Sequence, residues 1–293
     1  MKQKLLSIAL VAAGALAASS PFWAEPTQAA SAYSASTNAP DPARQIQDWA
    51  RLFRTGNVPA LARAVVPESR WDQLVAAYEL QKLHPLSERD RAQYAEKISR
   101  LTAPDAVEQL MVEIEPKLEE ARPQAPGALM MGMGALQLAA TSPESELTDE
   151  QRQALQNAIP GIQDWANRTD FLDSTTMRQA LGLITEAARR ARLDNLDEIR
   201  GLPLEAALDR ASTMLAAAKQ ATRLYGLDLD QIADSLTVDV LEMHGESARV
   251  RTTIVLFDAP VSFEHDLELV EGRWYGKEAA RHLREASRFS VEG

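Results

Sequence analysis

The chain has 293 residues, no cysteine, a formal net charge of −11 and 45% apolar residues. This length and apolar content can support a sizeable core, in one large domain or two smaller ones. The lack of cysteine excludes disulfides, thiolate metal ligands and a cysteine nucleophile, and the acidic balance argues against nucleic-acid binding, because phosphates require a basic face.

Residues 1–24 are predicted to be a bacterial-type signal peptide. Lys2 and Lys4 precede an apolar run from Leu5 to Ala18, and residues 15–17 have the A-x-A pattern of a cleavage site, with later cuts up to Ala29 left open. The sequence therefore predicts a periplasmic or secreted protein. The alternative is a membrane anchor formed by an uncleaved N-terminal segment, although the run is shorter than the roughly 20 apolar residues of a full span.

Residues 25–40 are rich in Ala, Ser, Thr and Pro and have no periodic pattern, which predicts a flexible leader. Folded structure is expected to begin at Asp41-Pro42, where Asp can cap a helix and Pro can occupy its first turn.

Residues 41–200 are predicted to form a helical domain. Apolar residues recur there at helical spacing, as in Ile46, Trp49 and Phe53, and Ser87 to Asp90 resembles a capping box. Another capping box is expected at Thr148 to Gln151.

An apolar run of 13 residues, Ala128 to Ala140, stands out within this region. It is too short to span a bilayer and is predicted to be a buried helix. Its Met130, Met131 and Met133 resemble the thioether clusters that bind Cu(I), but Met within such a run is more typical of core packing. We therefore assign no metal site.

The sequence IQDWA occurs twice, as residues 46–50 and 162–166. Two explanations fit this match: a diverged duplication of a helical unit, or a coincidence between two Trp-anchored amphipathic helices. A true repeat array would show self-similarity at a fixed period, and the sequence shows no such period, so the match does not decide between them.

Residues 201–293 are predicted to form a helix followed by a sheet module. Pro203 begins a regular amphipathic helix that ends at Tyr225-Gly226, and alternating apolar residues between Leu236 and Tyr275 then indicate strands joined by short turns. The predicted fold class is α+β: a mainly α-helical N-terminal region, with a C-terminal four-stranded antiparallel meander packed on helices and a closing helix to Arg288.

Known catalytic motifs are missing from the sequence, including a nucleophile elbow, His-Glu-x-x-His, a phosphate loop and a dinucleotide fingerprint. No cofactor is predicted. The strand period places His265 on the apolar face of its strand, and a speculative ligand pocket would be lined by Phe263, His265 and Trp274. A hydrogen-bonded core histidine is the simpler interpretation.

The segment from Leu204 to Tyr275, with its ending Leu269-Val270-Glu271-Gly272-Arg273-Trp274, resembles the C-terminal part of the ketosteroid-isomerase-like cone fold, in particular its small exported members. The resemblance implies a curved sheet wrapped over a helix, often enclosing an apolar pocket. It carries over no catalytic residue, and the long helical region before Leu204 departs from the compact family pattern.

Together these features favour a non-catalytic exported protein of the cell envelope that binds another envelope protein or a small apolar ligand. The alternative is a small-molecule carrier or enzyme with a pocket between the sheet and the helix of residues 203–225. No nucleic-acid partner is expected, and membrane contact is expected only if the N-terminal segment is uncleaved.

Overall fold

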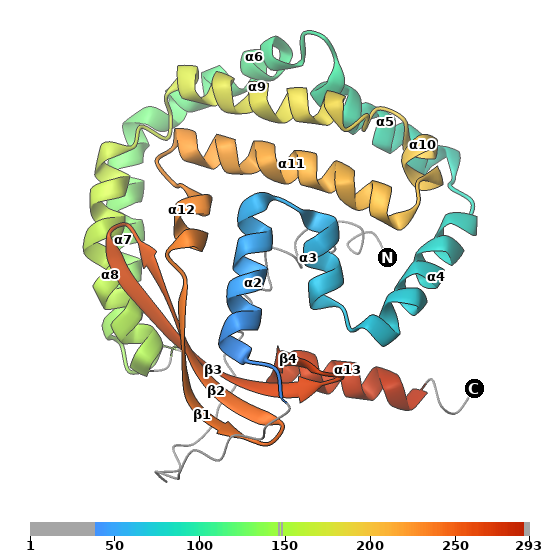
Figure 1. The fold of residues 1–293 in the computed structure, drawn as a ribbon. Coiled ribbons are helices and arrows are strands. Elements are labelled where there is room, and N and C mark those ends of the chain that lie inside the picture. The colour runs from blue at the N-terminus through green and yellow to red at the C-terminus, as the bar shows by residue number, and fades with distance from the viewer. Residues whose placement is uncertain (1–38, 146, 148, 290–293) are drawn as a thin grey trace. The chain divides into compact units, whose positions relative to one another are not determined.

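A computed structural model describes residues 39–145, 147 and 149–289, and it confirms the predicted α+β class (Figure 1). The predicted signal peptide, nearly all of the leader and Thr148 of the second capping box lie outside these residues. Within the described chain, no helix combines the length and the apolar character that crossing a membrane requires.

The N-terminal part of the described chain is helical. Its elements are α2 (Pro42–Thr55), α3 (Val58–Val65), α4 (Glu68–Leu83), α5 (Glu88–Thr102), α6 (Ala106–Ala121), the 3₁₀ turn η1 (Arg122–Gln124), α7 (Ala125–Thr141), α8 (Asp149–Arg168), α9 (Ser174–Arg190), α10 (Leu196–Gly201), α11 (Leu204–Leu224) and α12 (Leu229–Asp234). The C-terminal part contains the strands β1 (Thr237–His244), β2 (Ser247–Leu256), β3 (Ala259–Val270) and β4 (Arg273–Gly276), and then α13 (Lys277–Phe289).

The chain forms two compact units that do not follow the predicted division near residue 200. We call one the sheet unit; it holds the described residues up to Arg51, Ala135–Ile162, and the described residues from Ile232 onward. The other is the helical unit, Leu52–Gly134 with Gln163–Gln231. Helix α11 therefore belongs to the helical unit and the strands to the sheet unit.

The helical unit has a core in which α3, α4 and α11 meet. Val58, Trp71, Leu204 and Leu208 are buried together there, and the Arg63 guanidinium lies 4.3 Å from the centre of the Trp71 ring. Helix starts follow the predicted capping chemistry: the Ser87 hydroxyl accepts a hydrogen bond from the backbone N–H of Asp90 at 3.1 Å. Local polar residues thus set helix ends, and apolar stripes set helix packing.

The sheet is an antiparallel meander with strand order β1-β2-β3-β4. Its two-residue turns, Phe257-Asp258 between β2 and β3 and Glu271-Gly272 between β3 and β4, have positive φ at both positions, as type I′ turns require. A β-bulge between Val240 and Glu242 shifts the register of β1 on β2. This bulge determines which β1 side chains share a face.

One face of the sheet is apolar, as the alternation in the sequence predicts. Val250 is fully buried opposite His265, with Ala248, Leu267 and Trp274 in the same cluster. Nearer the Phe257 turn, a second cluster joins Ala154 and Ala158 of α8 to Val261 of β3. Helices of the sheet unit therefore cover this face.

The β4 edge of the sheet is closed by a side chain of α2. The Trp274 N–H donates to Gln45 Oε1 at 2.9 Å, and Gln45 Nε2 donates to the Trp274 carbonyl at 2.7 Å. The Trp274 indole N–H also donates to the Pro40 carbonyl at 2.6 Å. A glutamine amide therefore occupies the hydrogen-bonding position that a further strand would take.

Both copies of IQDWA are helical, in α2 and α8. Ile46 and Ile162 each pack against a cluster of the sheet's apolar face. The tryptophans differ: Trp49 lies 6.3 Å from Tyr275 between ring centres, whereas the Trp165 indole N–H donates to the Tyr225 carbonyl at 2.6 Å.

The prediction of a buried helix at Ala128 to Ala140 is correct for the helix and wrong for the burial. Helix α7 has Met130 at 75%, Met131 at 73% and Leu138 at 66% exposure, and Ala140 is its buried residue. The prediction that Met130 and Met131 pack in the core is therefore also wrong. A run that is apolar on every side cannot show which face is covered, because it has no polar face for comparison.

Candidate functional site

The three residues of the predicted pocket do not lie together. Phe263 and His265 are neighbours on β3, with ring centres 6.5 Å apart. Trp274 pairs with Leu269, six residues further along β3 than Phe263, which is about 20 Å at the usual rise of a strand. Trp274 is 1% exposed in the core. A small-molecule pocket beside His265 stays a prediction, and Trp274 acts in the core of the fold.

His265 lies on the buried face, as its position in the alternation predicts. Burial lowers the pKa of His265 below its ordinary value, and the nearby charge of Asp266 opposes this effect only in part. The fold thus favours the neutral imidazole, which is expected of a histidine in a largely apolar setting.

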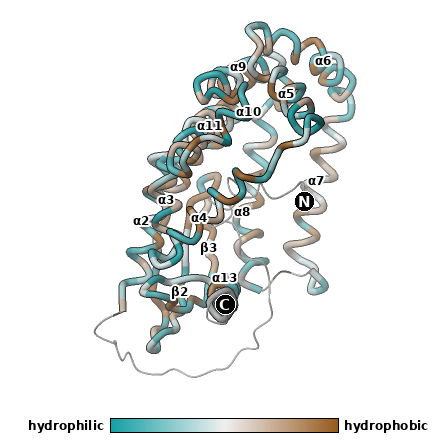
Figure 2. The backbone as a smooth tube through the Cα atoms, turned by 90° about the vertical axis from the view of Figure 1, so that its right-hand side faces the viewer, coloured by the Kyte–Doolittle hydropathy of each residue, from teal (hydrophilic) through white to brown (hydrophobic). Residues whose placement is uncertain are grey.

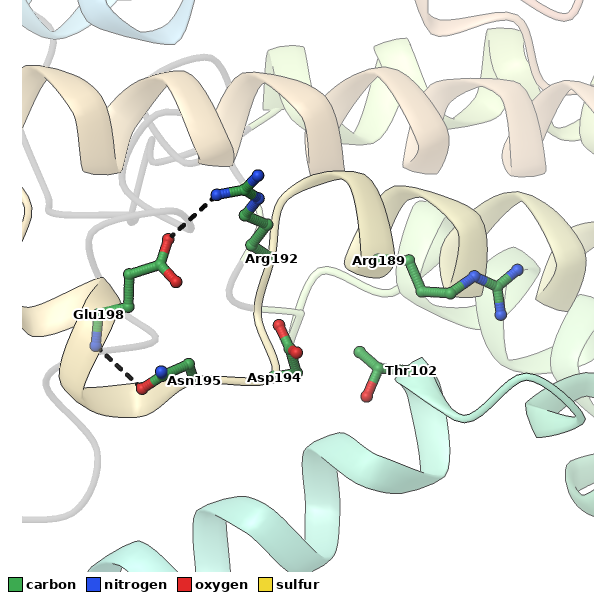
Figure 3. A pocket seen from close by; sticks show the side chains of 6 residues that line it. All are labelled: Thr102, Arg189, Arg192, Asp194, Asn195 and Glu198. Atoms are coloured by element: carbon green, nitrogen blue, oxygen red, sulfur yellow. Dashed lines mark hydrogen bonds and ion pairs between the residues drawn. The ribbon is translucent and has the colours of Figure 1, made fainter.

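A hollow of about 420 Å³ lies in the helical unit, where the C-terminal ends of α9 and α5 face the start of α10 (Figure 3). It is open and polar, and its lining residues are Thr102, Arg189, Arg192, Asp194, Asn195 and Glu198. Figure 3 shows Arg192 and Glu198 pointing toward one another, whereas Arg189 extends to the opposite side. The Arg189 guanidinium donates to the Ala103 carbonyl at 3.1 Å. At least one of the charged side chains that line this hollow, Arg189, therefore holds α9 against the segment that follows α5.

A smaller hollow, of about 220 Å³, lies on the polar face of the sheet. Its lining includes the carboxylates of Glu242, Asp266 and Glu268, together with Arg249 and Lys277. Burial would raise the pKa of Asp266, but hydrogen bonds and charge from Arg249 and Lys277 outweigh it and lower that pKa. This carboxylate therefore stays ionised, and carboxylates and cations alternate in this hollow.

Sequence reasoning missed a buried lysine in α11. The Lys219 side chain is 6% exposed; its ammonium donates to Asp230 Oδ1 at 2.6 Å, to the Arg54 carbonyl at 3.0 Å and to the Phe53 carbonyl. Phe53 and Arg54 belong to the last turn of α2, so the cation also lies where the negative end of the helix dipole favours it. All these groups belong to the helical unit, and the arrangement suits a structural role.

Helix α7 has a group of exposed apolar side chains. No charged residue occurs between Ala125 and Thr141, and Figure 2 shows more brown than teal along this helix. Met131, Gly134, Ala135 and Leu138 are exposed at the i, i+3, i+4, i+7 spacing of one helix face. Such a face can bind another apolar helix or segment, since the small residues allow close approach between two larger side chains.

The described residues contain no group of three or more His, Asp or Glu side chains placed to hold a metal ion. Comparison of the chain with known protein families, with curated proteins and with solved structures finds no match.

Proposed function

We propose that this is a non-catalytic exported protein of the cell envelope that binds another protein through α7. The observation that carries the proposal is the exposure of Met130, Met131 and Leu138 on a helix without a charged residue. Soluble proteins rarely leave several large apolar side chains exposed together unless the surface binds something.

The chemistry of this surface favours a protein partner. Methionine side chains are flexible and polarisable, and they adapt to partners of differing shape. Met131 and Leu138 flank Gly134 and Ala135, an arrangement of large and small residues that accommodates a helix. The net charge of −11 disfavours adsorption to an anionic lipid surface instead.

Export is proposed from the N-terminal sequence, in which Lys2 and Lys4 precede the apolar run and its A-x-A pattern. N-terminal sequencing of protein recovered from the cell envelope tests this part. A chain that still begins at Met1 in that fraction would contradict cleavage.

Binding is tested by photo-crosslinking in the exporting cell. A photoreactive residue placed at Met131 or Leu138 is expected to give one discrete adduct, whose partner is identified by mass spectrometry. Matched positions Glu96 and Lys97 on α5 are also exposed but polar, and they should not give this adduct. Met130→Lys, combined with the α7 crosslinker, should abolish it. Equal adducts from α5 and α7, or none from α7, would overturn the proposal.

A further inference from the structure

The two edges of the sheet differ. The β4 edge is closed by Gln45, as described above. In contrast, β1 is an eight-residue edge strand, and within the described part of the chain we find no hydrogen bond from a neighbouring segment to its outer backbone. Figure 1 shows β1 at the border of the meander. An open edge of this kind can pair with an extended chain.

Charge alternates across the polar face of the sheet in two rows. In the first row Asp239 of β1 lies opposite Arg251, whose guanidinium is 2.6 Å from Glu264 of β3. In the second row Glu242 lies opposite Arg249, which is 2.9 Å from Asp266.

Both rows end at the open edge with an exposed carboxylate, Asp239 or Glu242. Neither makes an ion pair shorter than 4.0 Å with any side chain in the described ranges. A strand added beside β1 would continue both rows if it carried a cation opposite each of them.

The bulge in β1 determines the spacing of these cations. Asp239 and Glu242 are three residues apart, but the bulge leaves them opposite Arg251 and Arg249, which are two residues apart. An added strand therefore needs basic residues at i and i+2. The residue between them would lie beside Val240, whose partner Val250 is fully buried on the apolar face.

From these observations we infer that the β1 edge binds an extended peptide segment of basic–apolar–basic pattern by strand addition. The hollow beside Glu242, which Asp266, Glu268, Arg249 and Lys277 also line, offers space for one of the two basic side chains. Pairing of β1 with a second copy of itself is disfavoured, because it would bring its own carboxylates together. This site is separate from α7, so a failure here leaves the α7 proposal standing.

The test uses the full-length mature protein and a fluorescent peptide with the sequence of residues 247–253, SARVRTT, which carries the required pattern. Saturable binding in fluorescence anisotropy is expected, with slower hydrogen exchange at the β1 amides. A control peptide SARRVTT has the same composition, but its arginines point to opposite faces of a strand and should bind about tenfold more weakly.

The double variant Asp239→Lys/Glu242→Lys should lose binding of SARVRTT and gain binding of the charge-reversed peptide SAEVETT. The matched variant Glu119→Lys/Glu120→Lys has the same charge change on exposed positions of α6 and should bind like the wild type. Because gained binding requires a folded sheet, this reversal remains informative even if the β1 variant is less stable.

Backbone pairing is tested separately. N-methylation of alternate peptide amides along one edge should abolish binding, and methylation along the other edge should spare it, because only one edge of an added strand faces β1. Four results would each overturn the inference: equal binding by both methylated peptides, unchanged binding of SARVRTT to the β1 variant, no saturable binding to the wild type, or no protection of the β1 amides. Any of these results would indicate instead that the bulge and the carboxylates protect the β1 edge from pairing with other chains.

Discussion

Replacement of Lys219 by methionine is expected to lower the free energy of unfolding by about 3 kcal/mol. The ammonium makes three hydrogen bonds from a side chain that is 6% exposed. Removal of one partner of a buried ion pair costs about 3–5 kcal/mol, because the other charge stays buried without compensation. We expect the lower end of this range, since Asp230 is 30% exposed and keeps Arg223 at 3.1 Å.

The assay is urea unfolding followed by circular dichroism, with Arg223→Met as the matched control. Arg223 pairs with the same aspartate but is 51% exposed, so its loss should cost about 0–1 kcal/mol. In a double-mutant cycle, Asp230→Asn should cost less in the Lys219→Met background than in the wild type. A loss below about 1 kcal/mol for Lys219→Met, or no coupling in the cycle, would refute the structural role.

Three further predictions use the sheet unit. Gly161→Ala would place a Cβ against the Phe257 carbonyl oxygen, closer than van der Waals contact allows, so the unfolding free energy should fall by about 1–3 kcal/mol. The control Gly182→Ala, in α9 of the helical unit, meets no neighbouring element within 4 Å and should raise the unfolding free energy by up to about 1 kcal/mol; equal effects of the two variants in urea unfolding would contradict the contact. Burial lowers the pKa of His265 in the folded protein, so at pH values between this lowered pKa and the ordinary pKa of about 6.5 the unfolded chain binds more protons and stability falls as pH falls. His265→Leu should flatten this pH dependence in thermal unfolding, and an unchanged slope would exclude His265 as its source. Gln45→Ala removes two hydrogen bonds to β4, so it should lower the free energy of unfolding by about 1–3 kcal/mol and speed hydrogen exchange at the β4 edge. Unaltered exchange at this edge would disprove its closure by Gln45.

The sequence alone was sufficient for the elements whose signals are local. Alternation from Val261 to Leu269 predicted a strand with one buried face, and the Ser87 capping box predicted the start of a helix. Both signals rest on residues within a few positions of each other, so they persist whatever the rest of the chain does. For the same reason, the meander with its short turns was predictable from residues 236–275.

Only the tertiary structure decided what covers each element. The run Ala128 to Ala140 gave no sign that α7 would expose Met130 and Met131, since a helix apolar on all sides fits a core and a binding surface equally well. No local signal marks Lys219 as buried, because its partners in α2 and at Asp230 are 11 to 166 residues away in the sequence. The β1 edge likewise depended on strand order, bulge and register, which arise from pairing between segments and not from any one of them.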